Sequence, residues 1–168
     1  QRQMCIRDSC VIEDNTKTRI LIDYGLSPGD PPTYPQESPP IDAAIITHAH
    51  LDHIGAVSRL QEIFEISFYL HKKEKMILDL YEDSCKMFGL PVKKKPTVDI
   101  WITDHKNLTF KEFEVNVINT PGHTPGGLCY EIFEHLFVGD TLFRGSVGRT
   151  DLPGGDLKLL LNSRKNYR

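Results

Sequence analysis

Short apolar segments separated by turn-forming residues recur along the chain. Residues 10–13 and 19–23 flank a polar turn at 14–17, which predicts a β-hairpin. Residues 41–47 are apolar without alternation, a pattern typical of a strand buried on both faces. Further strands are predicted at 66–70, 98–102, 108–110, 113–118, 128–133 and 136–138, the last two joined by a tight turn at Glu134-His135.

Helical spacing of apolar residues marks two segments, 55–63 and 72–88. The second predicts one helix, closed by Gly89 and Pro91, with Met76 and Met87 filling the core. A third helix is expected from Leu157, with Asp156 as its N-cap. Residues 25–40 hold six prolines and two glycines, so they must form a loop. Strands and helices mixed in this order predict the α/β class.

Composition supports one soluble globular domain. The chain has 168 residues, 39% of them hydrophobic and 26% charged. Its net charge of -3 gives no basic field for a nucleic acid, and no apolar stretch reaches membrane-spanning length. The four cysteines lack Cys-x-x-Cys spacing, so a reduced, cytoplasmic setting is expected. We therefore expect a small-molecule substrate and no nucleic-acid or membrane partner; the oligomeric state stays open.

The segment after the buried strand concentrates metal-binding side chains, with three histidines and an aspartate within residues 48–53. In an extended segment alternate side chains face the same way, so His48, His50 and Asp52 can converge on one point. His53 lies where the chain turns into a helix and can reach a second ion. Imidazole and carboxylate are both ligands of zinc. The pattern predicts a metal site; the alternative is a polar loop with satisfied histidines.

Two later residues are further donor candidates. His123 lies between a glycine and Thr-Pro-Gly-Gly, which indicates a constrained turn between strands. Asp140 follows Gly139, where it could also cap a turn. The remaining histidines, His71, His105 and His135, lie in strand ends or polar turns and are not expected to bind metal.

Three segments together resemble the metallo-β-lactamase superfamily. Thr-His-Ala-His-Leu-Asp-His at 47–53 resembles its signature, and residues 120–127 and 138–143 resemble the loops with the third histidine ligand and the bridging aspartate. The resemblance implies an αβ/βα four-layer sandwich with metals in the groove between two sheets. The implied ligands are His48, His50 and His123 on the first metal, Asp52 and His53 on the second, and Asp140 between them.

The segment 148–156 is similar to the glyoxalase II-like branch of this family. That similarity implies a hydrolase of a thioester such as an acylglutathione, with a metal-bound hydroxide as nucleophile and Asp52 orienting the water or moving its proton. Two zinc ions are the expected cofactors, with iron or manganese as alternatives. In the same segment Arg149 is expected to pair with Asp151 and to matter more for stability than for KM.

Both ends of the chain differ from the family pattern. Residues 1–9 resemble a non-native leader, so 10–168 is the expected domain. Relatives continue to a final strand and helix with a last histidine, whereas no histidine follows His135 here. We therefore expect a domain that is incomplete at its C-terminus and a second metal ion that is held weakly.

Other functions remain open at this point. A persulfide dioxygenase would bind one iron through His48, His123 and Asp140. An RNA-processing nuclease is a further alternative, because residues 20–56 also resemble that branch. A chain without its final strand and helix could instead be an inactive fragment. A secreted β-lactamase is disfavoured, because arginine and cysteine typically replace His53 and Asp140 there.

Overall fold

The computed structural model describes residues 2–6, 9–26, 33–35, 38, 40–103, 107–111, 113–163 and 165; His105 lies outside the described residues. The first sheet contains β1 (Arg2–Ile6), β2 (Ser9–Glu13), β3 (Arg19–Ile22), β4 (Ala43–Ile45), β5 (Ser67–His71) and β6 (Ile100–Ile102). The second contains β7 (Leu108–Phe110), β8 (Phe113–Asn119), β9 (Leu128–Ile132) and β10 (His135–Phe137). The helices are α1 (Leu51–Ile54), α2 (Val57–Phe64), α3 (Lys75–Asp79), α4 (Tyr81–Met87) and α5 (Leu157–Ser163), with 3-10 turns η1 (Lys72–Glu74) and η2 (Gly139–Thr141) and a small hairpin of β11 (Leu142–Phe143) and β12 (Ser146–Val147).

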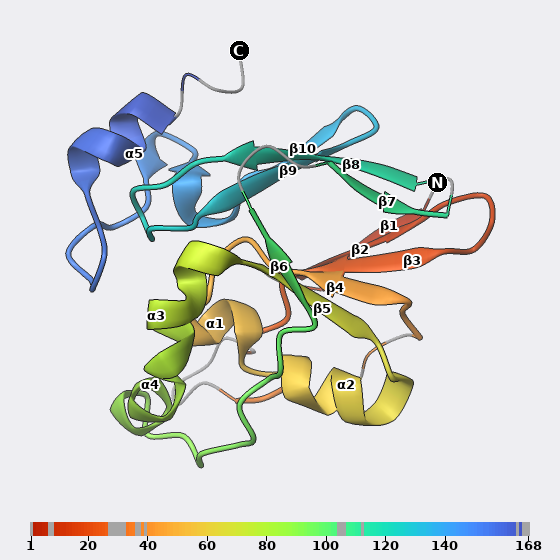
Figure 1. Cartoon of the computed structure of the whole chain (residues 1–168), viewed down its shortest axis with the longest axis horizontal. Helices are drawn as coiled ribbons and strands as arrows, with labels where there is room; N and C mark the ends of the chain where they lie inside the picture. The colour runs from red at the N-terminus through yellow and green to blue at the C-terminus, as the bar shows by residue number, and fades with distance from the viewer. Residues whose placement is uncertain are drawn as a thin grey trace.

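The two sheets stack on each other (Figure 1). The first has the order β1-β2-β3-β4-β5-β6, with β3 to β6 parallel and β1 to β3 antiparallel. The second is antiparallel in the order β10-β9-β8-β7. Helices α1 to α4 cover the outer face of the first sheet, and α5 lies at the end of the second (Figure 1). The predicted α/β class is confirmed.

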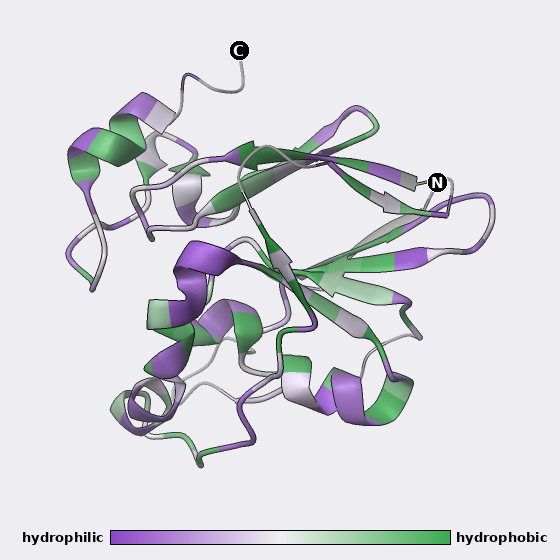
Figure 2. Ribbon diagram, viewed as in Figure 1, coloured by the Kyte–Doolittle hydropathy of each residue, from purple (hydrophilic) through white to green (hydrophobic). Residues whose placement is uncertain are grey.

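The first sheet is buried on both faces, which explains its unbroken apolar segments. Leu21 and Phe68 pack among the residues under the helices, whereas Ile20, Ile22 and Ile45 pack against the second sheet. Hydrophobic residues accordingly follow the strands between the layers, and polar residues occupy the outer helical surfaces (Figure 2). Among the described residues no helix is both long and apolar enough to cross a membrane.

The single helix predicted over residues 72–88 is divided into η1, α3 and α4. The helix is interrupted at Leu80, where ψ is 9° and the helical hydrogen-bond pattern stops. After this break α4 packs against α1, and the hydroxyl of Tyr81 donates to the carbonyl of Gly55 at 3.2 Å. A tertiary contact thus overrides the local helical periodicity.

The same break decides which side chains face the core. Ile77, Tyr81 and Cys85 are buried, whereas Met76 and Met87 are 49% and 71% exposed. The expectation that both methionines fill the core is therefore wrong.

The edges of both sheets also differ from the prediction. Residues 1–9 were expected to lie outside the fold, yet Arg2–Ile6 pairs antiparallel with β2 as an edge strand; its non-native origin stays a prediction.

The turn between β9 and β10 falls at Phe133-Glu134, one residue earlier than expected, with φ of 55° at Phe133. His135 consequently lies in β10.

The predicted N-cap of α5 is confirmed. The Asp156 carboxylate accepts the backbone N–H of Leu159 at 2.9 Å. The backbone N–H of Asp156 in turn donates to the carbonyl of Gly122 at 2.7 Å, and Ser163 Oγ donates to the carbonyl of Pro121 at 2.7 Å. Both ends of α5 are thus attached to the loop that carries His123.

Replacing Asp156 with Ala should lower the free energy of unfolding by about 0.5–2 kcal/mol, because the backbone N–H of Leu159 loses its acceptor at the start of a short helix. Asp156→Asn is the matched control, since its side-chain oxygen still accepts the bond. Urea unfolding followed by circular dichroism measures both. Equal losses for the two variants would contradict the capping role.

Candidate metal centre

The donor residues follow strand ends at one edge of the stacked sheets. Because β3, β4 and β5 are parallel, the segments after them leave the first sheet at the same edge. In the second sheet, His123 lies between β8 and β9, and Asp140 lies in η2 just after β10. Segments 70 or more residues apart in the chain, such as those of His48 and His123, therefore meet in space.

Asp23, at the end of β3, holds the histidine loop in place. Its carboxylate is buried and accepts bonds from the Thr47 N–H at 2.7 Å and the Thr47 hydroxyl at 2.8 Å. It also accepts from Nδ1 of His53 at 2.9 Å. Gly25, two residues after Asp23, passes so close to α1 that a Cβ there would lie 1.6 Å from the carbonyl oxygen of Asp52. These contacts hold residues 47–53, the histidine loop, against the end of β3.

Hydrogen bonds fix the tautomers of three histidines. The Thr47 hydroxyl donates to Asp23, so it can only accept from Nδ1–H of His48, 3.1 Å away. Nδ1–H of His123 donates to the carbonyl of Arg149 at 2.6 Å, and Nδ1–H of His53 donates to Asp23. All three rings therefore direct Nε2 into the site, as bonded outer groups do for metal-binding histidines.

The geometry of the first donor group fits a metal ion. Nε2 of His123 lies 3.2 Å from Nε2 of His48 and 3.0 Å from Nδ1 of His50. Ligands about 2.0–2.1 Å from a tetrahedral zinc are themselves about 3.3 Å apart. The Nδ1 protons of His48 and His123 are already donated elsewhere, so two lone pairs face each other. A shared cation resolves that contact, and His48, His50 and His123 are the residues that could hold it.

A second donor group contains His48, His53 and Asp140. Nε2 of His53 lies 3.2 Å from Oδ1 of Asp140, and Oδ2 of Asp140 lies 3.7 Å from Nε2 of His123. Because His48 belongs to both groups, the two sites are neighbours. Asp140 belongs to the second group and also lies near His123 of the first; its bridging role stays a prediction.

Asp52 is placed differently from the prediction. Helix α1 begins at Leu51, so the extended segment ends at His50 and alternate side chains no longer share a direction. The Asp52 carboxylate is 53% exposed and belongs to neither donor group. Its Oδ2 remains 3.8 Å from Nε2 of His53, at the rim of the site.

Burial and charge set the protonation of the donors. Burial and the neighbouring His53 and His50 rings hold the pKa of His48 well below its usual value. Burial and His123 lower the pKa of His50 to about 4. Both imidazoles are thus neutral at pH 7, the form that binds metal. Burial opposes a charge on His53, but the carboxylates of Asp23 and Asp140 outweigh it and hold its pKa well above the usual value.

The chain matches the metallo-beta-lactamase superfamily over residues 3–166. It belongs to this superfamily. The probable metallo-hydrolase YqgX of Bacillus subtilis is 40% identical over 125 residues, which are 72% of this chain and 59% of YqgX. Hydroxyacylglutathione hydrolase GloC of Haemophilus influenzae is 32% identical over 163 residues, 91% of this chain and 74% of GloC. A protein of Aquifex aeolicus is 38% identical over 125 residues, and the chain spans 58% of its length, as it spans 59% of YqgX.

Two solved structures share the fold of this chain. The BLEG-1 B3 metallo-beta-lactamase has a TM-score of 0.79 at 37% identity, with 95% of this chain and 78% of that chain covered. TTHA1623 in a di-iron-bound form has a TM-score of 0.74 at 31% identity, with 94% and 78% covered. The predicted metallo-β-lactamase fold is confirmed.

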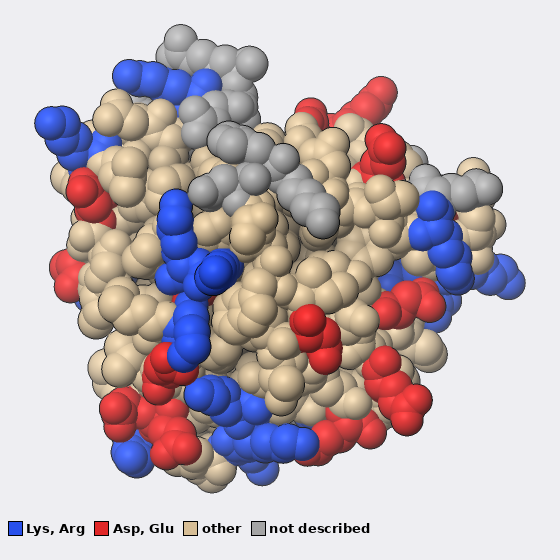
Figure 3. Space-filling view, in the orientation of Figure 1, with Lys and Arg blue, Asp and Glu red and all other residues tan. Residues whose placement is uncertain are grey.

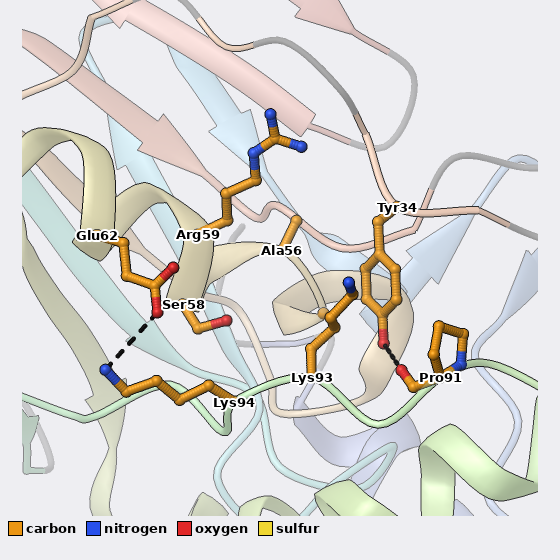
Figure 4. A pocket seen from close by; sticks show the side chains of 9 residues that line it. Tyr34, Ala56, Ser58, Arg59, Glu62, Pro91, Lys93 and Lys94 are labelled. Carbon is orange, nitrogen blue, oxygen red and sulfur yellow. Dashed lines mark hydrogen bonds and ion pairs between the residues drawn. The ribbon is translucent and has the colours of Figure 1, made fainter.

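A cavity of about 400 Å³ opens beside the second donor group. Its lining includes Asp52, His53 and Asp140 together with the aromatic side chains of Phe137 and Phe143. A larger cavity of about 540 Å³ lies between α2 and the segment after α4 and is lined by residues such as Arg59 and Lys93 (Figure 4). None of the six donor candidates lines this larger cavity, so the smaller cavity is the one that adjoins the candidate metal centre.

The predicted pair of Arg149 and Asp151 is present. Two bonds of 2.7 and 2.6 Å join the side chains, and the guanidinium lowers the pKa of Asp151 to about 2. Both side chains are more than 60% exposed, however, so the pair stabilises the fold little. It is the backbone carbonyl of Arg149, not its side chain, that orients His123.

Arg149→Ala should therefore leave the unfolding temperature close to that of the wild type, since the carbonyl that binds His123 is retained. This replaces the expectation that the side chain matters mainly for stability. A thermal melt monitored by circular dichroism measures the effect. A large drop in the melting temperature would contradict this, because it would show that the exposed ion pair contributes substantially to stability.

Sequence reasoning missed Asp23 and Glu74, two buried carboxylates that hold the metal-binding loops. Asp23 lies at the end of the predicted strand 19–23, whereas Glu74 lies within the predicted helix 72–88 and, in the structure, in the 3-10 turn after β5. For Asp23 the available signal was a carboxylate directly after the apolar residues 20–22. Glu74 lies among Lys72, Lys73 and Lys75, so the local sequence offered no such signal.

Asp23→Ala should lower the free energy of unfolding by about 3 kcal/mol or more, because it leaves Thr47 N–H and His53 buried without their partner. Asp83→Ala, on the exposed face of α4, is the control with the same atoms removed. Urea unfolding measures both. Similar stability of the two variants would mean that Asp23 does not hold the loop.

Proposed function

We propose that this chain is a metal-dependent hydrolase that cleaves thioesters of the acylglutathione type. The observation that carries the proposal is the pair of adjacent donor groups at the sheet edge, opening onto a partly apolar cavity. The 32% identity with hydroxyacylglutathione hydrolase GloC, which extends over 91% of this chain, supports the substrate class.

Two zinc ions are the proposed cofactors. His48, His50 and His123 would hold the first, and His53 and Asp140 the second, with Asp52 close by. Bound zinc supplies a Lewis acid for the substrate carbonyl and a nucleophile at neutral pH.

The chain's own residues contribute binding and proton transfer. Asp52 is exposed at the rim, 3.8 Å from His53, where it can accept a proton from an attacking water. Phe137 and Phe143 form an apolar wall that can hold an acyl group. No general acid is required for the leaving group, because a thiol with a pKa of about 8.5 leaves readily as the thiolate.

The test is hydrolysis of an S-acylglutathione by the full chain, monitored as the loss of thioester absorbance. We expect turnover with zinc, loss of turnover after a chelator, and recovery when zinc is added back. A folded, zinc-loaded chain that leaves thioesters and simple esters intact would refute the proposal.

Asp140→Asn should reduce turnover by at least about 100-fold, because it weakens a donor that faces both groups, and loss of mere outer partners already costs about 10–100-fold. Asp83→Asn, an exposed residue on α4, is the control and should retain full activity. Steady-state rates at saturating zinc measure both. An Asp140→Asn variant with normal turnover would remove this carboxylate from the mechanism.

Persulfide dioxygenase is the second candidate. His48, His123 and Asp140 form a two-histidine, one-carboxylate set, with 3.2 Å between the two Nε2 atoms and 3.7 Å from His123 to Asp140. Oxygen uptake by the iron-loaded chain with glutathione persulfide, without thioester hydrolysis, would favour this reading.

A nucleic-acid substrate has less support. Positive and negative side chains share the face shown in Figure 3, and the net charge is -3. Both features support a small-molecule substrate over an RNA.

A further inference from the structure

Glu74 lies outside both donor groups, yet its carboxylate contacts both metal-binding loops. The residue ends η1, directly after β5, and its relative exposure is 0%. Oε2 accepts the backbone N–H of Ala49 at 2.7 Å, and Oε1 accepts the backbone N–H of Gly126 at 2.7 Å. Ala49 separates His48 from His50, and Gly126 follows His123 by three positions.

Gly126 packs tightly against the side chains of Glu74 and His71. A Cβ on Gly126 would lie 2.5 Å from Nδ1 of His71 and 3.0 Å from Oε1 of Glu74. His71 is itself buried, so its ring has little room to withdraw. Glycine at this position is therefore what allows the His123 loop to approach the carboxylate.

A buried carboxylate is costly to keep in a protein interior. Burial raises the pKa of Glu74, although the bonds from Ala49 and Gly126 favour the charged form. A smaller apolar residue would remove that cost but leave two buried N–H groups without acceptors. Two oxygens on one rigid group satisfy both amides and set the distance between them.

We propose that Glu74 is a positioning residue that fixes the spacing of the His48-His50 loop and the His123 loop, and thereby sets the affinity of the first metal ion. The inference rests on the metal centre of the proposed function. Zinc–nitrogen bonds tolerate only small departures from about 2.0–2.1 Å, so a shift of either loop separates the imidazoles from a common point.

The test compares Glu74→Gln with Glu62→Gln, the same substitution on the outer surface of α2. Glutamine keeps one acceptor but turns an N–H₂ group toward the other amide N–H, so one bridge is lost. We expect Glu74→Gln to bind zinc about 10–100-fold more weakly in competition with a chromogenic chelator. Glu62→Gln should match the wild type.

The affinity is measured at a temperature where circular dichroism shows each variant fully folded, so that a purely structural role leaves it unchanged. A cobalt-substituted sample provides a second readout, because its visible absorption reports the ligand geometry. Glu74→Asp, which keeps the charge but is too short to reach both amides, should also bind zinc more weakly and serves if Glu74→Gln does not fold.

The outcomes separate the two proposals. Unchanged zinc affinity and cobalt spectrum in a folded Glu74 variant, with normal binding by the wild type, overturn the role of Glu74 alone. A wild type that binds no metal overturns the metal centre and the role of Glu74 together. Weaker binding in the variant supports the inference even if no thioester is hydrolysed.

Discussion

The site depends on one long-range approach, in which His48 from the first sheet and His123 from the second bring their Nε2 atoms to 3.2 Å. Neither loop can do this alone, because the distance is set by how the two sheets stack. The backbone N–H of Leu128 donates to the carbonyl of Thr47 at 2.9 Å, and the hydroxyl of Tyr130 donates to the carbonyl of Ile46 at 2.7 Å. Both bonds join β9 to the segment after β4, immediately beside the donors.

Around this approach, groups that do not bind metal determine how each donor points. Asp23, the carbonyl of Arg149 and Glu74 each bind a ring nitrogen or a loop amide. Each of these contacts joins two protein groups, so the orientation that it gives a donor does not depend on the ion itself. Such preorganisation is what a metal site requires of its surroundings.

The strands and the donor residues could be predicted from local sequence, because alternation, turn residues and the dense histidine segment are local signals. The break at Leu80 could not, since the bond from Tyr81 to Gly55 joins residues 26 apart. Asp23 and Glu74 were missed for the same reason: their partners lie 24 to 52 residues away. The expected convergence of Asp52 with His48 and His50 was wrong, because α1 begins at Leu51, two residues earlier than an extended segment through Asp52 requires.

The most direct test of the metal centre is the metal content of the folded chain, measured by elemental analysis after purification without chelator. We expect close to two metal ions per chain, with the first lost when His123 is replaced by Ala. A cooperatively folded wild type that retains no metal would contradict it.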